Sequence, residues 1–228
     1  METFTEELLN RMNIRTVFEI PILGGIPVTE SVVLSWGIMA FLVLGSIILV
    51  RNLKIIPGKK QLALEIAVGG IWDFFEGLMG ERGRRYIPYM ATVALFIGTS
   101  NLVGLVGLFP PTKDLNVTAG LAVMSIVLIE FAGIAQKGPK RWLKSFAEPM
   151  PIIAPINVME IFIRPLSLCM RLFGNILGGF VVMEMVKIAA PLLVPIPLSF
   201  YFDIFDGLIQ TYVFVLLTSL FIKEAIED

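Results

Sequence analysis

Long uncharged stretches dominate this chain and predict helices that cross a membrane. The first stretch, residues 31–50, contains twenty uncharged residues, and about 20 apolar residues span the hydrocarbon of a bilayer as a helix. Residues 86–135 contain two more stretches, separated by Pro110–Pro111. Two longer helical patterns occupy 155–224, and between them the proline-rich segment 191–197 is expected to break the helix. The pattern predicts an all-α integral membrane protein with about five membrane helices.

Residues 61–79 follow a different pattern, with polar side chains on one helical face and apolar side chains on the other. The polar face contains Gln61, Glu65, Gly69, Asp73 and Glu76. This is typical of an amphipathic helix that lies along the membrane surface, and a helix packed on a soluble partner is the alternative. Together with an N-terminal segment (1–30) outside the membrane, these elements predict a single membrane domain over residues 1–228.

The last two helical patterns are longer than a bilayer requires. The first runs from about 156 to 189, and at 1.5 Å per residue its 34 or so residues would measure about 50 Å. We expect this helix to tilt steeply, or to bend at Pro165 or Gly178–Gly179. The second is expected over about 198–224. Both are therefore predicted to be long and strongly tilted.

The distribution of lysine and arginine predicts the orientation in the membrane. Seven of these residues flank the amphipathic segment 61–79, and four more follow the third span, in the loop 136–150. The opposite side carries several acidic residues and few basic ones. Cytoplasmic loops are enriched in lysine and arginine, so the N-terminus is predicted outside and the C-terminus in the cytoplasm.

A stripe of polar side chains follows one face of the helix expected at 156–189. Steps of three or four residues place the whole stripe within an arc of about 80°. Its members are Asn157, Glu160, Arg164, Ser167, Arg171, Asn175 and Gly178. A charge at mid-bilayer depth costs on the order of 3 kcal/mol even on a lenient insertion scale, so the stripe indicates movement of ions. The alternatives are structural: a salt bridge for Arg171, and an i, i+4 pair between Arg164 and Glu160.

A second stripe lies on the last helix, where Asp203, Asp206 and Gln210 are expected to share a face of about 60°. The two stripes should face each other, a partner or water. Glu184 and Lys187, three residues apart and off the first stripe, are expected to form a structural pair. The roles of Glu130, Asp114 and Asn116 stay open between the ion path and local structure, and Asn116 is a candidate N-cap for the third span.

The amino-acid composition excludes several classes of function. The chain is 56% hydrophobic and only 16% charged, with a mean hydropathy of +0.84, unlike a soluble domain. It has no histidine and one cysteine, Cys169, and it contains no glycine-rich phosphate-binding loop. The expectation is a chain without a metal, cofactor, nucleotide or nucleic-acid site, and not an enzyme by itself. The acidic first 20 residues contain no apolar core of a cleavable signal peptide.

The segment LSLCMRLFGNILGG (166–179) strongly resembles the signature of subunit a, the stator channel in the membrane sector of F-type ATP synthases. Other segments resemble the same family in the same order, and the resemblance covers about 85–225, whereas residues 1–60 match mainly in hydropathy. These segments are NLVGLVGLFP (101–110), DLNVT (114–118), PINVMEIFIRPLSL (155–168) and IQTYVFVLLTSLFI (209–222).

The resemblance implies a function and a set of partners. The chain would provide two offset half-channels through which H⁺ or Na⁺ reaches a ring of c subunits, and would couple ion flow to rotation and ATP synthesis. Its partners would be the c-ring, the peripheral-stalk b subunits and the lipid bilayer, and its location a bacterial plasma (inner) membrane. A self-contained secondary transporter is the alternative, but it would predict internal repeats, and the chain shows none. A non-conducting scaffold would not explain the stripe.

The resemblance also implies roles for individual residues. Arg171 would be the essential charge that faces the c-ring, with Gln210 beside it. Asn175, Ser167 and Glu160 would line the ion path. Many members carry a glutamate where this chain has Phe180, and they vary among histidine and acidic residues where it has Asp203. We therefore expect the outer path to use Asp203 and Asp206, with Glu184 as a further candidate, and Phe180 not to bind ions.

Overall fold

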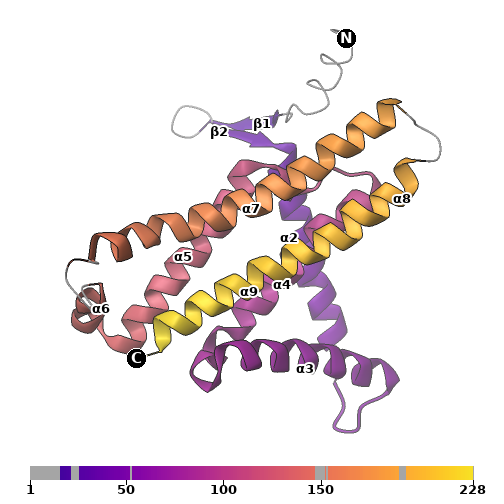
Figure 1. The fold of residues 1–228 in the computed structure, drawn as a ribbon. Coiled ribbons are helices and arrows are strands. Elements are labelled where there is room, and N and C mark those ends of the chain that lie inside the picture. The colour runs from indigo at the N-terminus through magenta and orange to yellow at the C-terminus, as the bar shows by residue number, and fades with distance from the viewer. Residues whose placement is uncertain are drawn as a thin grey trace. The chain divides into compact units, whose positions relative to one another are not determined.

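The computed structural model describes residues 16–21, 26–51, 53–146, 152, 154–189 and 194–227. Figure 1 shows a largely helical chain with one small pair of strands, β1 (Thr16–Ile20) and β2 (Ile26–Thr29). The helical elements are α2 (Glu30–Val50), α3 (Lys59–Met79), η1 (Glu81–Tyr86), α4 (Ile87–Leu102), η2 (Val103–Val106), η3 (Pro111–Lys113), α5 (Leu115–Lys137), α6 (Pro139–Ser145), α7 (Ala154–Ala189), α8 (Pro195–Ser199), η5 (Phe200–Asp206) and α9 (Gly207–Ile226).

Among the residues that the structure describes, five helical stretches are long and apolar enough to cross a membrane, which confirms the predicted fold class. They are Glu30–Val50, Glu81–Val106, Leu115–Lys137, Ala154–Ile188 and Pro195–Ile226. The amphipathic helix α3 is not among them, in agreement with the expectation that it lies along the surface. The tilt of the last two helices, the orientation of the termini and the single membrane domain remain predictions.

Proline has a different effect from the one expected at the start of α8. The break predicted over 191–197 is wrong in its second half, because α8 already begins at Pro195; residues 191–193 lie outside the described part. The first turn of a helix tolerates proline, since its amides have no intrahelical acceptor. Pro165 lies inside α7, which is 36 residues long, as the helical pattern over 156–189 predicted.

The β-hairpin was not predicted. β1 pairs antiparallel with β2, with Phe18 opposite Val28 and a bulge between Thr16 and Phe18. The signal was present in the sequence, since Gly24–Gly25 separate two short runs rich in β-branched and aromatic residues. An apolar chain dominated by helical periodicity obscured it.

Contacts divide the chain into two compact units, each assembled from three segments. Unit 1 comprises Met1–Ala40, Phe96–Thr118 and Met170–Thr211. Unit 2 comprises Phe41–Leu95, Ala119–Cys169 and Tyr212–Asp228. Several small polar side chains are buried inside the units, among them Ser100, Thr118, Ser125, Thr218 and Ser219. Small residues allow close approach of helices in membranes, where apolar surface alone does not drive their association.

In unit 1 the short segment around Lys113 and Asp114, which joins the second and third spans, is buried. Asp114 is only 1% exposed and accepts hydrogen bonds from the Asn116 backbone amide (2.9 Å) and the Thr29 hydroxyl (3.1 Å). Its own carbonyl accepts the first intrahelical bond of α5, from the Thr118 amide. Asp114 is therefore the N-cap of α5, and the expectation that Asn116 has this role is wrong.

We expect Asp114→Ala to lower the free energy of unfolding by about 1–2 kcal/mol, because it removes an N-cap and leaves the half-buried Thr29 hydroxyl without its acceptor. Asp114→Asn keeps an acceptor oxygen at the same place and should cost much less. Asn116→Ala is the matched control, since its side chain is exposed. Thermal unfolding of the detergent-solubilised protein measures all three. An equal loss for Asn116→Ala would contradict the cap assignment.

Candidate functional site

The polar stripe of α7 divides into an exposed part and a paired part. Ser167, Arg171 and Asn175 have exposed side chains. Asn157, Glu160 and Arg164, nearer the start of the helix, are half-buried. The stripe therefore lies in two environments: it is half-buried at Asn157, Glu160 and Arg164 and exposed at Ser167, Arg171 and Asn175.

Arg171 is exposed on α7, and no carboxylate of the described residues forms an ion pair with it. The ion pairs found among the described residues join other side chains. One of these side chains is Arg164, the other arginine of the stripe. On the same side of the helix Asn175 and Gly178 are also exposed. A guanidinium presented in this way is available to a group on another molecule.

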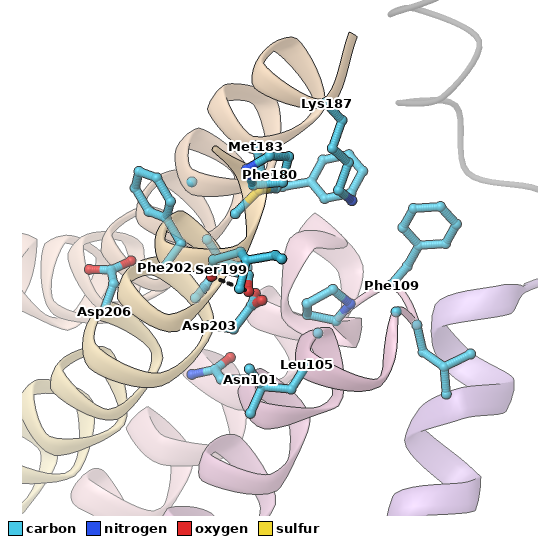
Figure 2. A pocket seen from close by; sticks show the side chains of 18 residues that line it. Asn101, Leu105, Phe109, Phe180, Met183, Lys187, Ser199, Phe202, Asp203 and Asp206 are labelled. Atoms are coloured by element: carbon cyan, nitrogen blue, oxygen red, sulfur yellow. Dashed lines mark hydrogen bonds between the residues drawn. The ribbon is translucent and has the colours of Figure 1, made fainter. Parts of the chain in front are cut away.

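Unit 1 contains a cavity of about 260 Å³, here called the Asp203 cavity, which is built mainly from η2, α7, α8 and η5. Its polar lining is contributed by Asn101, Lys187, Ser199, Asp203 and Asp206 (Figure 2). Glycines on two elements keep it open. A Cβ on Gly104 would lie 2.5 Å from the Asp203 carboxylate, and one on Gly179 would lie 3.0 Å from the Phe202 ring.

The structure corrects the expectation that Asp203, Asp206 and Gln210 share one face. Residues Phe200–Asp206 form a π-helix, and the Gly207 amide bonds the carbonyls of Phe202 and Ile204. A π-helical turn accommodates an extra residue, and one extra residue rotates the following side chains by about 100° relative to an uninterrupted helix. As Figure 2 shows, Asp203 and Asp206 project from different sides of the helix.

Gln210 is paired with the second of these carboxylates. It is buried, and its side-chain amide donates to Asp206 Oδ1 at 3.4 Å. These residues are four positions apart, at the spacing at which side chains of an α-helix meet. The site thus has one carboxylate beside Gln210 and another turned towards Gly104.

Basic groups accompany the acidic groups of unit 1. Lys187 Nζ forms an ion pair with the buried Glu184 at 2.8 Å, which confirms the predicted structural pair. Lys113 Nζ lies 3.6 Å from the centroid of the Phe109 ring and 4.4 Å from that of Phe180, an arrangement typical of a cation–π contact. Burial lowers the pKa of Lys113 from its ordinary value, and nearby carboxylates oppose this shift.

Unit 2 contains a second cavity of about 370 Å³, here called the Arg164 cavity. The Arg164 guanidinium pairs with Glu160 of α7 and with Glu224 of α9, the latter at 2.7 Å, and lies 4.9 Å from the centre of the Phe221 ring. Arg164 is 19% exposed, so its contacts are partly shielded from solvent. The pair with Glu160, given above as the structural alternative for Arg164, is confirmed, and Glu224 is an additional partner.

The wall of the Arg164 cavity includes a short loop helix. Trp142 of α6 donates from Nε1 to Glu130 of α5 at 3.1 Å, and its ring is perpendicular to that of Phe146. The Asn157 side chain donates to the Phe146 carbonyl at 2.9 Å. Glu130 therefore has a structural partner, which favours the local role among the alternatives left open for it.

We expect Arg164→Met to destabilise the protein more than Glu224→Gln. The first change leaves two carboxylates without their shared cation, whereas the second removes one mostly exposed partner, a contact worth about 1 kcal/mol or less. Thermal unfolding of both variants in the same detergent tests this. Equal losses would mean that Arg164 does not hold α7 and α9 together in unit 2.

Contacts between residues that lie far apart in the sequence were not predicted. Glu224 gave no signal, since 60 residues separate it from Arg164 and nothing marks it as a partner. The contacts of Lys113 with the Phe109 and Phe180 rings were not predicted. Gly104 was read only as part of a family-like segment, although it makes room for Asp203. These contacts depend on which helices pack together, which periodicity does not specify.

Comparison with known proteins gives a consistent result. A family profile described as "ATP synthase A chain" matches residues 32–223, which extends the resemblance into the first span. The chain is 35% identical to "ATP synthase subunit a, sodium ion specific" of Propionigenium modestum, over 90% of this chain and 76% of that protein. It is 38% identical to an ATP synthase subunit a of Moorella thermoacetica (88% and 92% covered) and 39% identical to that of Geotalea daltonii (87% and 88% covered).

Proposed function

This chain belongs to the ATP synthase A chain family and is a multi-pass, ion-translocating subunit of the membrane sector of a rotary ATP synthase, and we propose that Arg171 is the fixed charge through which it acts on the rotor. The observation that carries the proposal is an exposed arginine, unpaired among the described residues, on a helix that crosses the membrane. Ser167 and Asn175 share its face and would line the contact with a ring of c subunits. Gln210 would support it from α9.

Arginine suits this role because it keeps its proton. Its guanidinium stays protonated throughout the physiological pH range, so it cannot pass a proton along a chain of groups. Opposite a carboxylate on the ring it favours the ionised form and typically lowers the pKa of that carboxylate by about 1–3 units. The carboxylate then releases its ion when it approaches Arg171 and reloads after passing it, while the guanidinium blocks direct leakage.

The two cavities support separate access routes. With the N-terminus outside, as the positive-inside rule predicts, α7 runs outward and α9 runs inward. The Asp203 cavity, with Asp203 and Asp206, would then open towards the outside. The Arg164 cavity, with Glu160, would open towards the cytoplasm. Each ion that descends 100 mV between the two routes releases about 2.3 kcal/mol, which the rotor converts into torque.

The remaining partners follow from the same role. The complete subunit would contact the c-ring on the exposed stripe of α7 and the peripheral-stalk b subunits elsewhere, within a bacterial plasma membrane. The transported ion is H⁺ or Na⁺, and one relative is named as sodium ion specific. Because the ion-binding carboxylate would belong to the ring, the test compares ATP synthesis by vesicles under an imposed Na⁺ gradient with synthesis under an imposed pH gradient. Synthesis driven by the Na⁺ gradient identifies Na⁺, and synthesis driven only by the pH gradient identifies H⁺.

Disulfide cross-linking tests the contact with the ring. In a Cys169→Ser background of the assembled complex, Ser167→Cys should cross-link to cysteines placed on the outer helix of the c subunit. Leu166→Cys is the matched control, because Leu166 is 61% exposed at the same depth but points about 100° away. Cross-links from Leu166 in place of Ser167 would show that another face of α7 meets the ring.

A further inference from the structure

Asn101 of α4 is a buried amide at the Asp203 cavity, and it forms hydrogen bonds with three groups. It is 2% exposed. Its Nδ2 donates to the Gly207 carbonyl at 2.9 Å and to the Thr211 hydroxyl at 3.3 Å. Its Oδ1 accepts from the Thr112 hydroxyl at 2.7 Å. The hydroxyl of Thr112 therefore holds the amide with its donor group directed at Gly207.

The target of this amide is the residue at which the helix changes type. Gly207 is the first residue of α9 and directly follows the π-helical residues Phe200–Asp206. Its own amide bonds the carbonyl of Phe202, five residues back, which is the π pattern. The Thr211 hydroxyl bonds the Gly207 carbonyl at 2.8 Å, in the first α-helical turn after it. Asn101 thus contacts the first α-helical turn directly after the junction.

Close packing leaves little freedom at this point. A Cβ on Gly207 would lie 2.9 Å from Asn101 Cβ, so the two helices touch through a glycine. Nearby, η2 packs against η5, and the Asp203 carboxylate occupies the space that a side chain on Gly104 would fill. The position of the junction decides whether Asp203 enters that space or rotates out of it.

We propose that Asn101 is a positioning residue for the ion path. By binding the Gly207 carbonyl and the Thr211 hydroxyl, it fixes the residue at which the π-helix returns to α-helix. It thereby holds Asp203 in the cavity and Asp206 beside Gln210. The two carboxylates then have different tasks. Asp203 exchanges ions with water in the cavity, and Asp206 orients Gln210. This division of tasks depends on the proposed role of Asp203 in the ion path. The geometry of the junction does not depend on that role.

A cross-link reports the geometry directly. A Cβ on Gly104 would lie 3.0 Å from Asp203 Cγ, which is where the sulfur of a cysteine at 203 would lie. In the assembled complex with Cys169→Ser, the pair Gly104→Cys and Asp203→Cys should form a disulfide under mild oxidation. The pair Gly104→Cys and Asp206→Cys should not. Adding Asn101→Ala should slow the first cross-link by about fivefold or more, as expected for loss of a buried hydrogen bond.

Ser100→Ala is the matched control for this experiment. Ser100 is the preceding residue of α4 and is fully buried, and its hydroxyl has no hydrogen-bond partner among the described residues. Its replacement should leave the cross-link unchanged. An unchanged rate in Asn101→Ala, or an equal decrease in Ser100→Ala, would overturn the proposal.

Ion flux separates positioning from a role of Asn101 as polar lining. Asn101→Asp keeps an acceptor for Thr112 but loses the donor to Gly207. We expect ATP-driven ion uptake to fall about tenfold in both Asn101→Asp and Asn101→Ala, with Ser100→Ala unaffected. Retained flux in Asn101→Asp would refute positioning. If Asp203→Asn keeps its flux while the cross-link still depends on Asn101, the ion-path role fails and the junction assignment stands.

Discussion

Replacement of Arg171 by alanine is expected to abolish ion-driven ATP synthesis while the subunit still inserts into the membrane. Without the guanidinium, a ring carboxylate that reaches this position would keep its ion. A pKa higher by about 1–3 units lowers the ratio of ionised to neutral carboxylate by roughly 10- to 1,000-fold. The measurement is ATP synthesis by inverted vesicles under an imposed ion gradient, with subunit abundance determined by immunoblot.

Two further variants sharpen this test. Arg171→Lys keeps a positive charge but loses the planar fork, and a buried lysine can lose its proton, so we expect only partial synthesis. Arg164→Met removes the other arginine of the stripe, whose partners Glu160 and Glu224 are internal, and should leave more synthesis than Arg171→Ala. Full synthesis in Arg171→Ala would refute the assignment of the fixed charge.

Asp203→Asn is expected to reduce ion flux far more than Lys187→Ala. Asp203 lines the cavity beside Gly104, and asparagine has the same shape but cannot ionise. A correctly placed proton-transfer group typically contributes about 10²–10⁴-fold to a rate, so a loss near the lower end is expected. Lys187 also lines the cavity, but its ammonium pairs with Glu184. Its loss should change the flux by about a fewfold at most, because the Lys187 side chain is 47% exposed and such a contact is weak.

Proton or Na⁺ uptake by vesicles that contain the complete complex measures both variants. Asp206→Asn provides the comparison within η5. Because Asp206 accepts from Gln210 and asparagine retains an acceptor oxygen, Asp206→Asn should be milder than Asp203→Asn. Equal effects of Asp203→Asn and Lys187→Ala would exclude the Asp203 cavity as the access route.

Much of the fold could be predicted, because in a membrane protein the length of an apolar stretch indicates whether it spans the bilayer as a helix. The spans, the amphipathic α3 and the stripe of α7 follow from periodicity and from the cost of charge in hydrocarbon. The i, i+4 pair Arg164–Glu160 and the i, i+3 pair Glu184–Lys187 were also predictable, since helix geometry alone brings such residues together. The β-hairpin and the helical start at Pro195 were readable in principle and were missed.

The sequence by itself determined the membrane class, the spans and the family, because the hydrocarbon selects long apolar helices and the motif around Arg171 is specific. Only the tertiary structure decided where Asp203 points, since a π-helix stabilised by Asn101 from another helix overrides the regular periodicity. It also decided that Arg164 has a second partner in Glu224 and that Asp114 caps α5. Such contacts depend on which surfaces of distant segments pack together, and a repeat of 3.6 residues carries no information about that.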